Sequence, residues 1–168
     1  MALRVWELTK LRWAIATLMA VAVAAFVLSG CGMSVPTDPD GTLDRVRGGE
    51  LRVGVSHNPP FTGIVEGAEP TGVEVELVEG FADELGASVT WVVGSEAALV
   101  QGLEDGTLDL AIAGFRDDSP YVEEAGSTQP FLETEDAAGG KVSRVMLTPM
   151  GENAFLVELE TYLAEATS

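Results

Sequence analysis

The stretch Thr107-Leu-Asp-Leu-Ala-Ile-Ala-Gly-Phe-Arg-Asp-Asp-Ser-Pro-Tyr121 decides the fold. Its first half, Leu108–Ala113, is an apolar run without a helical period, which predicts a buried strand. Its second half opens with Gly114 and becomes polar at once at Arg116 and Asp117. Ligands of open α/β sheets bind just beyond the carboxyl ends of the strands, so we expect a binding site here.

Strands and helices alternate on the N-terminal side of this stretch. The predicted elements are a short helix at 42–46, strands at 50–56 and 88–93, and helices at 71–85 and 95–105. Thr71 and Glu74 have the spacing of a capping box, and Ser95 is placed to cap the second helix. Strand–helix–strand–helix–strand is a right-handed parallel unit. The predicted fold class is therefore α/β, with an open, mainly parallel sheet and flanking helices.

The C-terminal side continues the sheet and ends in a helix. The pattern predicts an extended piece at 126–131, a loop at 133–140, a strand at 142–147 and an amphipathic helix at 152–165. The loop is acidic and rich in glycine, which makes it a poor segment for a core.

Composition excludes several functions. With 27 acidic and 9 basic residues, the net charge is −18, which argues against binding of nucleic acid. One histidine and one cysteine provide no cluster for zinc and no Cys/His pair for catalysis. We therefore expect no metal, no cofactor and no enzymatic activity. Arg116 is the only lysine or arginine between Arg52 and Lys141, which makes it a candidate anchor for an anion.

The N-terminus has a secretory pattern. Basic residues precede an apolar run from Trp13 to Leu28, which is shorter than the roughly 20 residues that a membrane span needs. The run ends in Leu28-Ser29-Gly30-Cys31, which resembles the lipobox of bacterial lipoproteins. We expect residues 1–30 to be a lipoprotein signal peptide, Cys31 to be lipidated, residues 31–49 to be a tether, and residues 50–168 to form one lobe. The protein would then be anchored by its lipid to the extracytoplasmic face of the cell membrane.

An ordered set of short segments resembles the extracytoplasmic solute-binding proteins of ABC importers, in the family that binds polar amino acids. The segments are Glu50-Leu-Arg-Val-Gly-Val55, Pro60-Phe61, Gly72-Val-Glu-Val-Glu-Leu77, Leu103-Glu-Asp-Gly-Thr-Leu-Asp-Leu-Ala-Ile-Ala-Gly114, Ser127-Thr-Gln-Pro-Phe131 and Pro149-Met-Gly-Glu-Asn-Ala-Phe-Leu156. Their order and spacing are those of the family's first lobe. The resemblance implies one lobe of a type II periplasmic-binding-protein fold.

Two departures from the family pattern are visible. The family has a second lobe inserted where this chain has only the residues from Leu132 to Lys141. The arginine that holds the ligand's α-carboxylate in the family falls here on Tyr121, and a hydroxyl position falls on Arg116. Arg116 would then be a relocated anchor, or it forms a surface salt bridge with a neighbouring aspartate.

The resemblance implies a binding protein for a small polar solute such as an amino acid, working with the permease of a membrane transporter. The candidate ligand-binding residues are Ser56, His57, Asn58, Phe61, Gly114, Phe115, Arg116, Asp117 and Tyr121. One lobe covers only one side of a solute, so weak affinity is expected. The alternatives are a sensor or interaction lipoprotein that has lost solute binding and, remotely, an enzyme similar to cyclohexadienyl dehydratases.

Overall fold

A computed structural model describes residues 37–136 and 138–168. The expected signal peptide, Cys31 and the first part of the expected tether lie outside these residues. Within the described ranges, no helix has the length and apolar character that crossing a membrane requires.

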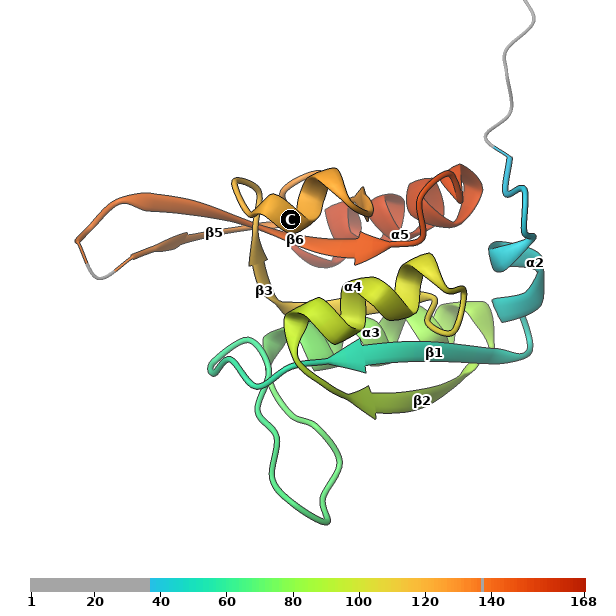
Figure 1. The fold of residues 1–168 in the computed structure, drawn as a ribbon, viewed down its shortest axis with the longest axis horizontal. Coiled ribbons are helices and arrows are strands. Elements are labelled where there is room, and N and C mark those ends of the chain that lie inside the picture. Colours follow the sequence, from blue (N-terminus) through green and yellow to red (C-terminus); the bar gives the residue numbers. More distant parts are fainter. Residues whose placement is uncertain (1–36, 137) are drawn as a thin grey trace, which may run out of the picture. The chain divides into compact units, whose positions relative to one another are not determined.

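A mixed sheet forms the centre of the folded unit (Figure 1). Its strands are β1 (Glu50–Val55), β2 (Ser88–Val93), β3 (Leu110–Arg116), β4 (Gly126–Ser127), β5 (Leu132–Glu135) and β6 (Lys141–Thr148). The order is β2-β1-β3-β6-β4, and β5 also pairs with β6. β1 is parallel to both β2 and β3, which confirms the predicted parallel unit. β6 runs antiparallel to β3, β4 and β5.

Helices cover both faces of this sheet. They are α2 (Thr42–Val46), α3 (Val73–Leu85), α4 (Glu96–Glu104) and α5 (Asn153–Ala166), with a short 3-10 helix, η1, at Pro120–Glu123. Alternation along β3 fixes the two layers: Leu110 and Ile112 join a core with α2, α3 and α5, whereas Ala111 and Ala113 join a core with α4. The predicted fold class is confirmed, and α2, α3, α4 and α5 form where the sequence predicted helices, whereas η1 was not predicted.

The third strand lies further along the chain than predicted, since it begins at Leu110 and not at Leu108. We expected it to end at Ala113, but β3 continues through Arg116. Gly114 lies within the strand and has a positive φ of 62°. The pairing register against β6 shifts around it, between Ala111 and Phe115. The glycine therefore marks a bulge in the strand and not its end.

The predicted capping box at the start of α3 is wrong. The N-cap is Gly72, and no side chain caps the helix. Glu74 is fully buried and its carboxylate turns to the backbone of Gly114, a residue far along the chain. Ser95 does cap α4 as predicted, since its hydroxyl accepts a hydrogen bond from the Ala98 N–H at 3.4 Å.

A β-hairpin stands where the loop at 133–140 was predicted. β5 pairs with β6 from Leu132↔Arg144 to Glu135↔Lys141. At the turn, the Asp136 N–H donates to the Gly140 carbonyl at 2.8 Å. The first half of the predicted loop is thus a strand. Its acidic sequence carries no strand pattern of its own, but pairing with the backbone of β6 holds it extended. Figure 1 shows this hairpin extending away from the rest of the sheet.

The segment before β1 packs onto the end of the molecule where α5 begins. Helix α2 forms at 42–46 as predicted and buries Leu43 and Val46. Glu152 accepts hydrogen bonds from the N–H groups of Asp40 and Thr42, both at 2.9 Å. Asp38 in turn accepts bonds from the first N–H groups of α5. The two carboxylates thereby connect residues 38–46 to the lobe.

Candidate functional site

The carboxyl ends of β1 and β3 meet at one edge of the sheet, where the turn that follows β1 contacts the bulge in β3. The Asn58 amide donates to the Ala113 carbonyl at 2.7 Å. The Phe61 side chain is only 8% exposed and lies against Gly114. A Cβ atom on Gly114 would stand 2.6 Å from the Phe61 ring and 2.7 Å from the Asn58 amide nitrogen. The structure therefore brings Asn58, Phe61 and Gly114 into direct contact.

The backbone of the turn after β1 holds these side chains in place. Phe61 N–H donates to the Asn58 carbonyl at 3.0 Å, and Asn58 N–H donates to the Thr62 carbonyl at 2.8 Å. The buried Thr62 hydroxyl donates to the carbonyl of Ser56. The exposed His57 accepts a hydrogen bond at Nδ1 from the Ile64 N–H at 3.0 Å. Ser56 and His57 thus stand in the turn beside the Asn58–Phe61 contact.

Both backbone polar groups of Gly114 form hydrogen bonds with ionisable side chains. Its N–H donates to Glu74 Oε2 at 2.8 Å, and its carbonyl accepts from Arg144 Nη1 at 2.7 Å. The other carboxyl oxygen, Oε1, is buried without a partner. Burial raises the pKa of Glu74 to about 7, although the hydrogen bond from Gly114 and the charge of Arg144 oppose the rise.

Arg144 lies over the ring of Phe61. Its guanidinium carbon is 4.3 Å from the ring centroid, within the range of a cation–π interaction. Nε donates to the Thr134 hydroxyl at 3.1 Å, so a side chain of the β5–β6 hairpin fixes the guanidinium plane. Sequence analysis missed both Glu74 and Arg144 as site residues. The signal that could have found Arg144 is its place as the only basic residue within the apolar part of β6.

The other predicted residues on β3 and its loop have different surroundings. Arg116 Nε and Nη2 donate to the two carboxylate oxygens of Asp118 at 2.8 and 2.9 Å. This pair is exposed, so it contributes little to stability. Phe115 is buried in the core under α4, and its ring packs edge-on against Tyr121 with centroids 6.0 Å apart. Asp117 is exposed and donates its N–H to the Ser143 carbonyl.

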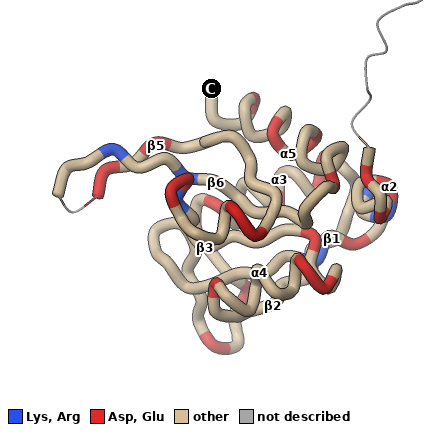
Figure 2. The backbone as a smooth tube through the Cα atoms, turned by 45° about the horizontal axis from the view of Figure 1, so that its top comes forward, with Lys and Arg blue, Asp and Glu red and all other residues tan. Residues whose placement is uncertain are grey.

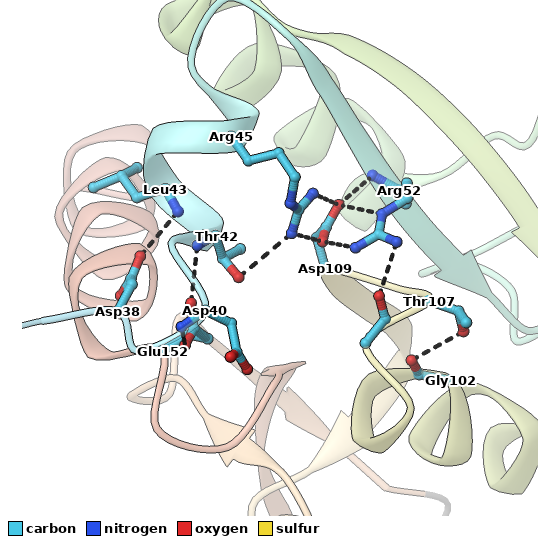
Figure 3. Close-up of polar contacts among 11 residues, drawn as sticks. Asp38, Asp40, Thr42, Leu43, Arg45, Arg52, Gly102, Thr107, Asp109 and Glu152 are labelled. Atoms are coloured by element: carbon cyan, nitrogen blue, oxygen red, sulfur yellow. Dashed lines mark hydrogen bonds and ion pairs between the residues drawn. The ribbon is translucent and has the colours of Figure 1, made fainter.

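A cavity of about 550 Å³ lies at the opposite end of the parallel strands. An ion cluster lines it, which Figure 3 shows: Asp109, 0% exposed, accepts hydrogen bonds from the partly exposed Arg45 and Arg52. Burial alone would raise the pKa of Asp109, but the hydrogen bonds from the two arginines outweigh it and hold the pKa below its ordinary value. Since the three charged groups bind one another, this cluster has a structural role.

Charge is distributed unevenly over the folded unit. Acidic residues occur along most elements, whereas basic residues gather at α2, near β1 and on the β5–β6 hairpin (Figure 2). Among the residues at 37–136 and 138–168, no group of His, Cys, Asp and Glu could hold a metal ion.

Comparison with known proteins identifies relatives of the fold. Residues 51–167 match the family described as bacterial extracellular solute-binding proteins, family 3. A search of curated proteins found no match.

Solved structures give the same architecture. Domain 1 of the T. maritima arginine-binding protein TmArgBP, in its arginine-bound form, is 21% identical with a TM-score of 0.62, covering 73% of this chain and 97% of that domain. The unliganded L-cystine solute receptor of Neisseria gonorrhoeae is 13% identical with a TM-score of 0.61, covering 73% and 89%. An ancestral amino-acid-binding protein, described as a precursor of cyclohexadienyl dehydratase, is 14% identical with a TM-score of 0.63, covering 74% and 92%. These likenesses show a single domain of the type II periplasmic-binding-protein fold.

Proposed function

The chain belongs to the bacterial extracellular solute-binding proteins of family 3, and from this premise we propose that its lobe binds a small polar solute, such as an amino acid, at the carboxyl edge of β1 and β3. The observation that carries the proposal is the contact of Asn58 and Phe61 with the Gly114 bulge. It joins an amide, an aromatic ring and backbone groups at the edge where α/β sheets bind ligands.

The single lobe is compatible with binding. The relative TmArgBP has a domain 1 described as an arginine-bound form, and this chain covers 97% of that domain. A single lobe nevertheless buries only one side of a solute, whereas tight pockets enclose roughly 70–90% of a ligand surface. We therefore propose that affinity for free solute is weak, in the micromolar range or weaker, unless a partner supplies the opposite wall.

Members of this family are extracellular, and we propose that this protein works from the extracytoplasmic face of the cell membrane. Lipidation of Cys31 would anchor it there, close to the permease of a transporter that accepts the solute. The support for this step is the sequence before Cys31, in which small residues follow an apolar run.

Two measurements test these steps. Calorimetric titration with each proteinogenic amino acid is expected to give saturable binding that weakens at least tenfold in Asn58→Ala. Binding to none of them, together with a membrane complex that survives purification of Asn58→Ala, would favour a sensor or interaction lipoprotein instead. Detergent phase partitioning tests the anchor: the wild-type chain should enter the detergent phase and Cys31→Ala should not.

A further inference from the structure

Arg144 differs from every other arginine that the structure describes. Arg45 and Arg52 bind Asp109, while Arg47 and Arg116 pair with Glu158 and Asp118, respectively. Within residues 37–136 and 138–168, Arg144 forms no ion pair with a carboxylate, and its Nη2 makes no hydrogen bond. In a chain of net charge −18, an arginine left without an acidic partner requires an explanation.

The guanidinium of Arg144 is fixed by three contacts, although its Nη2 makes no hydrogen bond to the described residues. Thr134 accepts from Nε at 3.1 Å, the Gly114 carbonyl accepts from Nη1 at 2.7 Å, and the Phe61 ring supports its face. The residue is only partly exposed. Because its rotamer is already fixed, binding an anion at Nη2 loses little conformational entropy.

The acidic residues near Arg144 do not accept a hydrogen bond from its Nη2. Glu74 bonds the N–H of Gly114 from a fully buried position. Asp118 holds both of its oxygens on Arg116. Arg144 also covers the face of Phe61 on which a cationic side chain would otherwise stack. The arrangement therefore disfavours cationic solutes and leaves a donor for an anionic group.

We propose that Arg144 is the specificity-determining residue of this site and that it receives a carboxylate of the solute. The inference rests on the proposed solute-binding function and narrows it to solutes that carry a carboxylate without a cationic side chain. Nη2 carries N–H donors that make no hydrogen bond to the described residues, and a charge-assisted hydrogen bond from them to a carboxylate oxygen is stronger than a neutral one. Arg116, the cation that the sequence singled out, has its donors on Asp118 and is not the anchor.

The test follows the arginine Nε–H signals of the full chain in detergent by NMR while acetate, succinate, L-glutamate and L-arginine are added. Arg144→Lys identifies the Arg144 signal by its disappearance. It keeps the positive charge and removes the planar guanidinium. Arg116→Lys is the matched control, because it makes the same change at an arginine already paired. A backbone amide spectrum checks that each variant is folded. Arg144→Gln, which removes the charge and the guanidinium, serves if Arg144→Lys does not fold.

We expect the three carboxylates without a cationic side chain to shift the Arg144 signal saturably. Binding of L-glutamate should weaken roughly tenfold or more in Arg144→Lys or in Arg144→Gln, and change less than about twofold in Arg116→Lys. L-Arginine should bind at least about tenfold more weakly than L-glutamate.

The outcomes separate this inference from the function on which it rests. If acetate and succinate shift the Arg144 signal but no amino acid binds, the carboxylate site at Arg144 is supported and the proposal that the lobe binds amino acids is rejected. If an amino acid binds and shifts the amides of Asn58 and Phe61 while Arg144 is unmoved, the inference is overturned and solute binding stands. Absence of any shift of Arg144 with every carboxylate, or a preference for L-arginine, also overturns it.

Discussion

The carboxylate of Glu74, at the start of α3, accepts a hydrogen bond from the N–H of Gly114, within β3, at 2.8 Å. The two residues lie 40 positions apart, and Glu74 is fully buried. This bond fixes the first turn of the helix to the bulge in the strand. It also places an ionisable group with one unpartnered oxygen directly behind the candidate site.

The first prediction concerns the pH dependence of stability. The pKa of Glu74 is raised to about 7 in the folded state from an ordinary 4.5, so the folded state binds the proton more tightly than the unfolded state. The stabilisation is fully present below about pH 4.5 and is lost as pH rises to about 7. The difference amounts to roughly 3 kcal/mol in the free energy of unfolding.

Glu74→Gln should remove that loss, because the amide stays neutral and its oxygen still accepts from Gly114. Urea unfolding at pH 5 and pH 8 measures the difference between wild type and variant. Glu76→Gln is the control, since Glu76 is an exposed acid in the same turn of α3. Equal pH trends for wild type and Glu74→Gln would show that burial of this carboxyl carries no penalty.

The second prediction separates backbone strain from steric overlap at Gly114. Gly114 and Gly86 have nearly the same φ, 62° and 64°. A Cβ on Gly86 meets nothing within 4 Å, whereas one on Gly114 meets Phe61 and Asn58. Gly86→Ala should cost about 1 kcal/mol of unfolding free energy from the left-handed backbone alone. Gly114→Ala should cost about 3 kcal/mol, because overpacking adds to that strain. Similar losses in urea unfolding would mean that the Phe61 ring moves aside freely.

The third prediction concerns the ion cluster around the buried carboxylate of Asp109. Asp109→Asn weakens the charge-assisted hydrogen bonds that Asp109 accepts from the partly exposed Arg45 and Arg52, and we expect a loss of about 2 kcal/mol in unfolding free energy. Asp118→Asn breaks the exposed pair with Arg116 and should leave the free energy of unfolding almost unchanged. Chemical denaturation of the two variants side by side tests this contrast. A loss of similar size at both positions would contradict the structural role given to Asp109.

The fourth prediction concerns the attachment of α2. Asp38 accepts hydrogen bonds from Leu43 N–H with one oxygen and from Ala154 and Phe155 N–H with the other. Asp38→Ala removes the acceptor of N–H groups in the first turns of α2 and α5, and it should cost about 1–2 kcal/mol of unfolding free energy. Hydrogen exchange should accelerate at these three amides while the strands stay protected. Asp40→Ala is the control, because Asp40 contributes its backbone N–H and not its carboxylate to Glu152. Unchanged exchange in Asp38→Ala would show that apolar packing alone holds the segment.

The parallel unit was predictable because the residues that form each of its strands and helices lie close together in the sequence. The apolar runs of β1 and β3, the spacing of Leu99 and Leu103 in α4, and the stripe of α5 each bury the face that the pattern indicates. Ser95 caps its helix from within the same turn. Periodicity and capping act over a few residues, so they are visible without the fold.

The misjudged features depend on partners far along the chain. Thr71 and Glu74 match a capping box, but the carboxylate of Glu74 accepts a hydrogen bond from the N–H of Gly114 and does not cap the helix. Gly114 reads as a strand end, yet pairing with β6 continues beyond it. Arg144 was missed because its contact with Phe61 joins two segments that nothing local relates. Among the candidate residues, Asn58, Phe61 and Gly114 meet, whereas Arg116 and Tyr121 contact other neighbours.

The β5–β6 hairpin has a further consequence for how proteins of this architecture are assembled. Its two strands leave and re-enter the sheet as adjacent neighbours, and its turn is closed by a hydrogen bond between Asp136 and Gly140. Exposed turns of this kind tolerate insertions, because a polypeptide that starts and finishes at neighbouring points leaves the host core undisturbed. The turn of this hairpin is therefore a position at which a gene fusion could insert a whole domain, or remove one, while the packing of the core stays the same.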